Sequence, residues 1–270
     1  MPKAKLSLSL ISKQPILDPA LGLNEPSGLT LNHDGTALYT VSDDTKAIFR
    51  LDLKGRVVVE ESFFTGVDDL EGIAISGDGL QLFAVQEDTN SVISFDLATR
   101  AEISRQPLMD MENYSSIADH FPAKPDNKGL EGITVNTRTG NIVVVKESRP
   151  GLLIEIDLPR GRILDARLLK ETNGFNHPDL AIDKLDFSGL SYDSSRDTFW
   201  ITSDKGQCLF HYDWKKNGVI QRLDLNRKAD KSSAKVRKSE GVAIDPAKQM
   251  LYVVSERDGD LYTYRINSHG

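Results

Sequence analysis

The chain has 270 residues, enough for one large all-β domain or two ordinary domains, and 39% of them are hydrophobic. The net charge of −7 argues against nucleic acid as the main partner, because binding to phosphates needs a basic surface. The single cysteine, Cys208, excludes an intrachain disulfide and a cysteine-based zinc site, and the five histidines lack zinc-ligand spacing.

The chain begins with a strand pattern. Residues 1–13 read MPKAKLSLSLISK, in which Leu alternates with Ser, whereas a signal peptide needs a continuous apolar stretch. No apolar run reaches the length of a transmembrane helix. We therefore expect a soluble protein without a transmembrane segment, cytoplasmic if this N-terminus is the native one.

Five segments then repeat around a glycine. They read EPSGLTLNHDG, DLEGIAISGDG, GLEGITVNTRTG, DFSGLSYDSSRD and SEGVAIDPAKQ, and their glycines are Gly28, Gly72, Gly132, Gly189 and Gly241. Apolar and small or polar residues alternate after each glycine, which predicts a strand. The glycine itself is expected where a neighbouring backbone passes closely.

Further strands follow each glycine strand. The second strands read ALYTVSD, QLFAVQE, NIVVVKE, TFWITSD and MLYVVSE, and the third read AIFRLDL, SVISFDL, LLIEIDL, CLFHYDW and DLYTYRI. A fourth strand is visible in RVVVEESFF, RILDARLL and GVIQRLDL, and weakly in AEISRQPL. Four short strands per unit, with glycines 44, 60, 57 and 52 residues apart, are typical of β-propeller blades.

The fifth unit has only three strands, so the N-terminal segment AKLSLSLIS is expected to supply its fourth strand and close the ring. We predict a single all-β domain over residues 1–270, a five-bladed β-propeller with four antiparallel strands per blade. The alternative of six blades requires a unit hidden in a long connection. The long connections are 109–128, 171–186 and 226–238, and we expect them around the mouth of the central channel, as functional loops or as tolerated surface insertions.

The segments NKGLEGITVN with VVVKESRPGLLIEID, DFSGLSYD with ITSD, and SEGVAID with LYVVSE resemble the SdiA-regulated (YjiK-like) β-propeller family, from about Ala4 to Ile266. The resemblance implies a bacterial propeller, often at the cell envelope or in the periplasm, with no well-established activity. More distantly the chain is similar to phytase-like and gluconolactonase-like propellers, which hold calcium in or near the central channel.

An acid stands fifteen residues after every repeat glycine, and the residue before the glycine is Ser or Glu. The pairs are Ser27 with Asp43, Glu71 with Glu87, Glu131 with Glu147, Ser188 with Asp204, and Glu240 with Glu256. The turn lies halfway between the two members, which places them on neighbouring antiparallel strands. Adjacent carboxylates need a shared proton, a lysine or arginine, or a bound cation. Calcium suits a set of oxygen ligands, so we predict a Ca²⁺ site from Glu71, Glu131, Glu240, Glu87, Glu147 and Glu256.

Other residues near these glutamates are candidates for ligand binding. Two acids, Glu25 and Asp186, lie two residues before the serines, and His120 and His177 lie in the first two insertions as possible acids, bases, ligands or solvated side chains. The ligand-binding candidates are Glu25, Asp43, Asp186, Asp204, Lys146, Arg149, His120 and His177. Alternatively, the second acid of each pair is part of the scaffold and accepts backbone hydrogen bonds, and Lys128 or Lys146 neutralises Glu131.

Two functions remain open. The first is a monomeric binding module, in which calcium stabilises the ring and the channel mouth recognises a small molecule or a protein partner. The second is a calcium-dependent hydrolase of phosphate or carboxylate esters, by analogy with the distant propellers. A hydrolase needs a water activator and electrophilic help over one pocket, and the sequence offers only carboxylates and two loop histidines. We favour the binding module.

Overall fold

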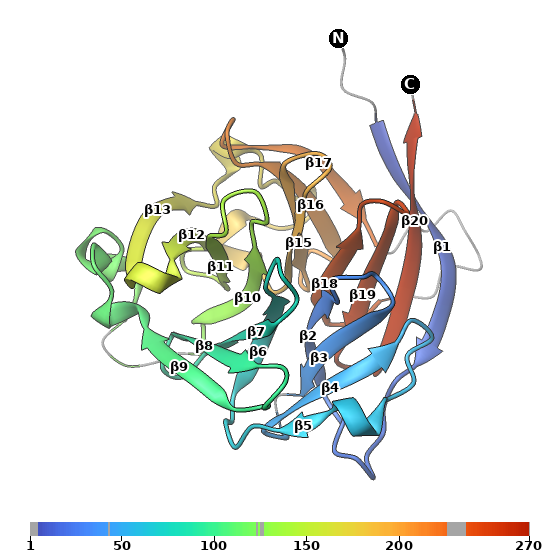
Figure 1. Ribbon diagram of the computed structural model, residues 1–270. Helices are drawn as coiled ribbons and strands as arrows, with labels where there is room; N and C mark the ends of the chain where they lie inside the picture. The colour runs from blue at the N-terminus through green and yellow to red at the C-terminus, as the bar shows by residue number, and fades with distance from the viewer. Residues whose placement is uncertain (1–4, 43, 123, 125–126, 226–235, 270) are drawn as a thin grey trace.

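The computed structural model describes residues 5–42, 44–122, 124, 127–225 and 236–269. Five four-stranded antiparallel sheets stand in a ring around a central channel, with the chain ends side by side (Figure 1). This is the five-bladed β-propeller that the repeat predicts. Helical structure within these ranges is limited to short 3₁₀ turns, and none of the described helices is long and apolar enough to cross a membrane.

In blades 1 to 4 the strands run outward from the channel in chain order, and in blade 5 the N-terminal strand is the outermost. Blade 1 contains β2 (Pro26–Leu31), β3 (Ala37–Ser42), β4 (Ala47–Asp52) and β5 (Phe63–Phe64), and blade 2 contains β6 (Leu70–Ile75), β7 (Gln81–Gln86), β8 (Ser91–Asp96) and β9 (Glu102–Pro107). Blade 3 contains β10 (Leu130–Val135), β11 (Ile142–Lys146), β12 (Leu152–Asp157) and β13 (Arg162–Leu168), and blade 4 contains β14 (Leu190–Asp193), β15 (Thr198–Ser203), β16 (Cys208–Asp213) and β17 (Gly218–Asp224). Blade 5 contains β18 (Ser239–Asp245), β19 (Met250–Ser255), β20 (Asp260–His269) and β1 (Lys5–Pro15).

The N-terminal strand closes the ring as predicted. Strand β1 pairs antiparallel with β20, from Lys5 opposite His269 to Pro15 opposite Asp260. The first and last parts of the chain therefore share one sheet, and the hydrogen bonds between them hold the ring shut.

The hydrophobic cores join neighbouring blades, because alternate residues of each strand face opposite sides of the sheet. Val143 and Val145 of β11, for example, share a core with Phe199 and Ile201 of β15. Cys208 lies fully buried in this core, and burial raises the pKa of its thiol to about 12. It is a small core residue, as its apolar surroundings in the sequence indicate.

The outer strands of blades 1 and 2 differ in length from what the sequence pattern predicts. Most of RVVVEESFF, the predicted fourth strand of blade 1, is not a strand: only β5 forms, preceded by the 3₁₀ turn η1 (Val59–Glu61). The hydroxyl of Ser62 accepts a hydrogen bond from the backbone N–H of Arg50 at 3.0 Å. A side chain thus takes the place of a backbone acceptor from the predicted fourth strand at this edge of β4. The weak signal in AEISRQPL does form a strand, β9.

The first two insertions pack between blades, and the expectation that they stand at the channel mouth was wrong for these parts. In the first, η2 (Leu108–Asp110), η3 (Tyr114–Ser116) and η4 (Ala118–His120) lie at the periphery beside β13 and bring Met111 and Ile117 into a core (Figure 1). In the second, between η6 (Glu171–Asn173) and η7 (Ile182–Lys184), Phe175 is fully buried against Phe187. Burying such a side chain contributes about 1.5–3 kcal/mol, which explains the inward fold. Most of the third insertion lies outside the described residues. The 3₁₀ turn η5 (Leu158–Arg160), which belongs to no insertion, joins β12 to β13.

Candidate functional site

The repeat glycines mark the closest backbone approach between neighbouring blades. A Cβ atom on Gly132 would lie 2.4 Å from the carbonyl oxygen of Ser188, and one on Gly28 would lie 2.5 Å from that of Glu71. Gly72, Gly189 and Gly241 meet the carbonyls of Glu131, Glu240 and Ser27 in the same way. Each glycine therefore contacts the residue that precedes the next repeat glycine, and no side chain fits there, as predicted.

This contact gathers the residues that precede the glycines into one closed ring. The ring members are Ser27, Glu71, Glu131, Ser188 and Glu240. We call the end of the channel where the inner strands begin, and where these residues lie, the carboxylate end. The hydroxyl of Ser27 donates to Glu71 at 2.6 Å, and the hydroxyl of Ser188 bonds to Glu240, so each serine bridges to the next blade.

Two groups of carboxylates meet at the carboxylate end. One oxygen from each of Asp69, Glu71 and Glu87 lies within 4.8 Å of the other two, and the same holds for Glu87, Glu131 and Glu147. The two groups share Glu87, so five carboxylates form one continuous network. Glu71 meets Glu87, and Glu131 meets Glu147, in agreement with the spacing of fifteen residues from each glycine.

The charges of this network repel one another. Burial, together with the charges of Glu71, Glu240, Glu87 and Glu147, holds the pKa of Glu131 well above its usual range. Burial also raises the pKa of Glu87 to about 7 and that of Glu240 to about 8. Near neutral pH, full ionisation of these groups therefore requires a compensating positive charge.

Lysines lie beside Glu147 of the network and beside Glu256. The Nζ atoms of Lys128 and Lys205 lie 3.3 and 3.4 Å from Glu147, and Lys238 forms an ion pair with Glu256. Lys146, the other predicted partner of Glu131, donates to the carbonyl of Ser148 and lies over the ring of Phe121. In the part of the chain that the structure describes, no ion pair reaches Glu131 or Glu87.

Several of the other acids support the scaffold. Glu87 accepts the N–H of Gly129 at 2.8 Å, and Asp204 accepts that of Lys238, in both cases from the next blade. Asp186 is buried and accepts the N–H of Lys205 at 3.0 Å and the hydroxyl of Ser203 at 2.9 Å. The alternative that the second acid of a pair caps backbone groups thus describes Asp204, while Glu87 combines such a cap with membership of the network. Asp186, predicted as a ligand-binding residue, also binds scaffold groups.

The remaining predicted ligand-binding residues do not join the network. Arg149 is exposed, His120 is half-buried at the end of η4, and Nδ1 of His177 accepts the N–H of Asp179. Glu25 is half-buried, its backbone N–H donates to Ser42, and Asp43 lies outside the described residues. Of the predicted pairs, Glu71 with Glu87 and Glu131 with Glu147 thus converge, whereas Glu240, Glu256, the loop histidines and Arg149 are in neither carboxylate group.

Asp69 is the network residue that the sequence interpretation missed. It stands three residues before Gly72, in the same register as Glu25 before Gly28 and Asp186 before Gly189. The structure gives it a left-handed backbone, and its carboxylate accepts the N–H of Asp88. The repeat register contained this signal, since the third residue before the glycine is acidic in three of the five repeats.

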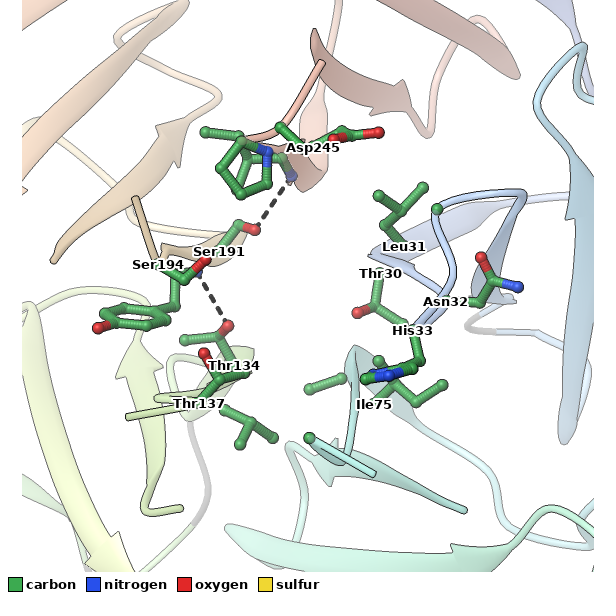
Figure 2. Close-up of a pocket in the computed structure, with 18 of the residues that line it drawn as sticks. Thr30, Leu31, Asn32, His33, Ile75, Thr134, Thr137, Ser191, Ser194 and Asp245 are labelled. Carbon is green, nitrogen blue, oxygen red and sulfur yellow. Dashed lines mark hydrogen bonds between the residues drawn. The ribbon is translucent and has the colours of Figure 1, made fainter. Parts of the chain in front are cut away.

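Two cavities of different size lie near the residues described above and at the opposite end of the channel. A cavity beside Glu87, lined also by Phe121 and Lys146, has a volume of about 10 Å³, close to the space of one water molecule. Where the inner strands finish, a cavity of about 380 Å³ opens (Figure 2). We call this second end the hydroxyl end, because hydroxyl side chains line it: Thr30, Thr134, Thr137, Ser191 and Ser194.

Comparisons with known proteins agree with the repeat and the fold. A family model described as SdiA-regulated matches residues 14–263. No curated protein matches the chain. Among solved structures, the glutaminyl cyclase of Myxococcus xanthus is similar, with a TM-score of 0.68 and 12% sequence identity over 99% of this chain and 100% of that chain. At this identity the likeness shows the fold alone.

Proposed function

The chain belongs to the SdiA-regulated family, as its repeats predict, and on that premise we propose that it is a calcium-binding module whose carboxylate end holds Ca²⁺ and recognises a ligand or protein partner. The observation that carries this proposal is the continuous network of Asp69, Glu71, Glu87, Glu131 and Glu147. A cation would neutralise the repulsion that now raises the pKa of Glu131.

The ligand atoms fit calcium. Within the described ranges, the two carboxylate groups contain oxygen ligands and neither histidine nor cysteine, which zinc prefers. Calcium takes six to eight oxygens, and a carboxylate can supply one or two of them. Two of the glutamates, Glu71 and Glu131, stand in the ring around the channel, while Glu87 links the two groups.

A bound cation would also explain how an acidic protein attracts a partner. Carboxylate or phosphate oxygens of a ligand could complete the coordination of Ca²⁺, whereas the metal-free network would repel them. The cavity of about 10 Å³ beside Glu87 is too small for an organic molecule, so it would not hold such a ligand. We therefore place recognition on the outer side of the carboxylate end.

The hydrolase alternative has no arrangement in its favour. Neither His120 nor His177 belongs to the carboxylate groups found in the described residues, and an ester hydrolase needs a water activator next to its metal. The cyclase activity named for the Myxococcus xanthus protein is not proposed either, because only the fold is shared.

The test is a calorimetric titration of calcium into protein freed of metal with EDTA. We expect saturable binding that weakens at least about tenfold in Glu131→Gln and in Glu71→Gln, since each substitution removes a charged ligand. Glu171→Gln, at an exposed position in the second insertion, is the matched control and should bind calcium like the unmodified protein. Absence of saturable heat, or equal affinity in all three variants, overturns the proposal.

A further inference from the structure

The hydroxyl end is built from repeat positions, as the carboxylate end is. Two residues after the glycines stand Thr30, Ala74, Thr134, Ser191 and Ala243, and five residues after them stand His33, Gly77, Thr137, Ser194 and Pro246. Nine of these ten residues line the cavity of about 380 Å³, and Ala243 is the exception. Figure 2 shows Thr30 on one side of the cavity, facing Thr134 and Ser191 on the other.

Two of the hydroxyls are held in place by the next blade. Oγ1 of Thr134 accepts the N–H of Tyr192 at 3.0 Å, and Oγ of Ser191 accepts the N–H of Ile244 at 3.2 Å (Figure 2). A hydroxyl that accepts one hydrogen bond keeps its own proton as a donor. These two side chains are therefore fixed in position and can still donate into the cavity.

The same bond cannot form where the repeat has alanine. Tyr192 and Ile244 stand three residues after their glycines, and Leu31 and Val135 stand at that position in blades 1 and 3. The blade before blade 1 is blade 5, which has Ala243 at the repeat position of Thr134 and Ser191. The blade before blade 3 is blade 2, which has Ala74 there. Alanine has no side-chain acceptor for the N–H group of the next blade.

The N–H groups of Leu31 and Val135 nevertheless point to the channel. Successive N–H groups of a strand point to opposite edges. Asn32 donates to Ala37 at 2.8 Å and Asn136 donates to Asn141 at 2.9 Å, both within their own blade. The preceding residues, Leu31 and Val135, therefore direct their N–H groups away from the neighbouring strand and towards the channel.

At the rim, Lys248 and Asp245 compensate each other, whereas Asp34 is engaged by hydrogen bonds from Thr36. Nζ of Lys248 lies 3.0 Å from Asp245 and donates to the carbonyl of Gly35 at 2.8 Å, and Asp34 accepts the N–H of Thr36 at 3.1 Å. An anionic ligand would find Lys248 already paired with Asp245, whereas a neutral ligand rich in hydroxyls can both donate and accept. Leu31, Ile75 and Val135 add apolar wall.

We propose that the hydroxyl end binds a small, neutral, polyhydroxylated molecule of the size of a monosaccharide. The N–H groups of Leu31 and Val135 and the hydroxyls of Thr30, Thr134 and Ser191 form its polar contacts. The volume of about 380 Å³ lies in the range of small-molecule sites, roughly 300–1,000 Å³. This site is distinct from the calcium site and does not depend on it.

The test follows the amide NMR signals of the full chain while D-glucose, D-galactose and myo-inositol are added separately at millimolar concentrations. We expect saturable shifts of the Leu31 and Val135 amides with at least one of them, and none at Gly129 of the carboxylate end. The same shifts should appear in protein treated with EDTA, so failure of the calcium proposal leaves this result unaffected.

Two variants make the test specific. A Cβ on Gly77 meets no atom within 4 Å, so Gly77→Trp should fill the mouth without disturbing the fold and should abolish the shifts. Thr30→Val removes one hydroxyl at nearly constant volume and should weaken binding roughly fivefold, while Thr172→Val, at an exposed loop position, should have no effect. The proposal is overturned if none of the three compounds produces a saturable shift, or if Gly77→Trp and Thr30→Val bind like the unmodified protein.

Discussion

At the carboxylate end the five inner strands begin with serine and glutamate, whereas at the hydroxyl end they finish around a cavity of about 380 Å³ lined by threonine and serine. Both ends use fixed repeat positions: the ring residues stand one before the glycine and their glutamate partners fifteen after it at the first end, and the cavity residues stand two and five after it at the second. At each repeat glycine the backbones of neighbouring blades approach one another in the same way in all five blades. A propeller of this kind can therefore combine an ionic site and a neutral site on one scaffold.

The glycine contacts that separate the two ends give the largest expected effect. In Gly132→Ala the new methyl group would lie 2.4 Å from the carbonyl of Ser188, and we expect a loss of roughly 3 kcal/mol or more in the free energy of unfolding. Urea unfolding measures this loss. Gly77→Ala, whose Cβ meets no atom within 4 Å, is the control and should change stability by less than about 0.5 kcal/mol. A neutral Gly132→Ala would show that the blades do not depend on this contact.

Calcium should stabilise the protein more at high pH than at low pH. Glu87 and Glu240 have folded-state pKa values of about 7 and about 8, above the ordinary value of 4.5. The stability that these groups contribute is fully present below pH 4.5 and is lost as the pH rises through 7 to 8, because the folded state then loses the protons that it binds more tightly. Saturating calcium, at about 100 times its Kd, should add about 2.7 kcal/mol.

The measurement is the difference in Tm with and without calcium at pH 5 and pH 8. We expect a clearly larger difference at pH 8, because at pH 5 protons compete with the cation for the carboxylates. An equal difference at both pH values would contradict the role of the raised pKa values in calcium binding.

A smaller expected effect on the free energy of unfolding distinguishes Asp186, an acid of the scaffold, from Glu131 of the carboxylate network. Asp186→Asn weakens the bonds to Lys205 and Ser203 and should cost about 1–2 kcal/mol without changing calcium affinity. Glu131→Gln should leave the metal-free protein at pH 8 at least as stable as before, because it removes a repelled charge, yet lose calcium binding. Unfolding and calorimetry on both variants check this. Loss of calcium binding in Asp186→Asn together with unchanged binding in Glu131→Gln would reverse the assignment.

The smallest effect on stability is expected at the hydroxyl end. Thr30→Val should change the free energy of unfolding by less than about 0.5 kcal/mol and leave calcium affinity unchanged, since no glutamate of the carboxylate end lies there. Urea unfolding and calcium titration of this variant measure whether the two ends are independent. A change in calcium affinity would show that they are coupled.

The fold could be predicted from the sequence because several independent features of the repeat indicate the same architecture. The glycine register, the alternation of the strands and the missing fourth strand of blade 5 together predict five blades closed by β1, and the structure has this arrangement. The insertions could not be placed, because the burial of Met111 and Phe175 depends on grooves that exist only after the blades have assembled.

The charged residues of the candidate site at the carboxylate end could be predicted from the sequence. The spacing from Gly72 to Glu87 and from Gly132 to Glu147 brings glutamates together, and their repulsion identifies them as unusual. Thr30, Thr134 and Ser191 gave no such signal, because small polar residues are ordinary in a strand and a neutral hydroxyl causes no repulsion. Their role depends on which side of the strand faces the cavity, which the sequence pattern alone does not give.

The most direct test of the central claim is a calcium titration by calorimetry at pH 7, repeated in two buffers of different ionisation enthalpy. The metal-free protein should bind calcium and release protons, because burial and neighbouring charges raise the pKa values of Glu131 and Glu87 and calcium must displace the protons that they hold. Glu131→Gln should lose both the heat and the proton release. Absence of binding, or binding without proton release that persists in Glu131→Gln, would contradict a calcium site at the carboxylate end.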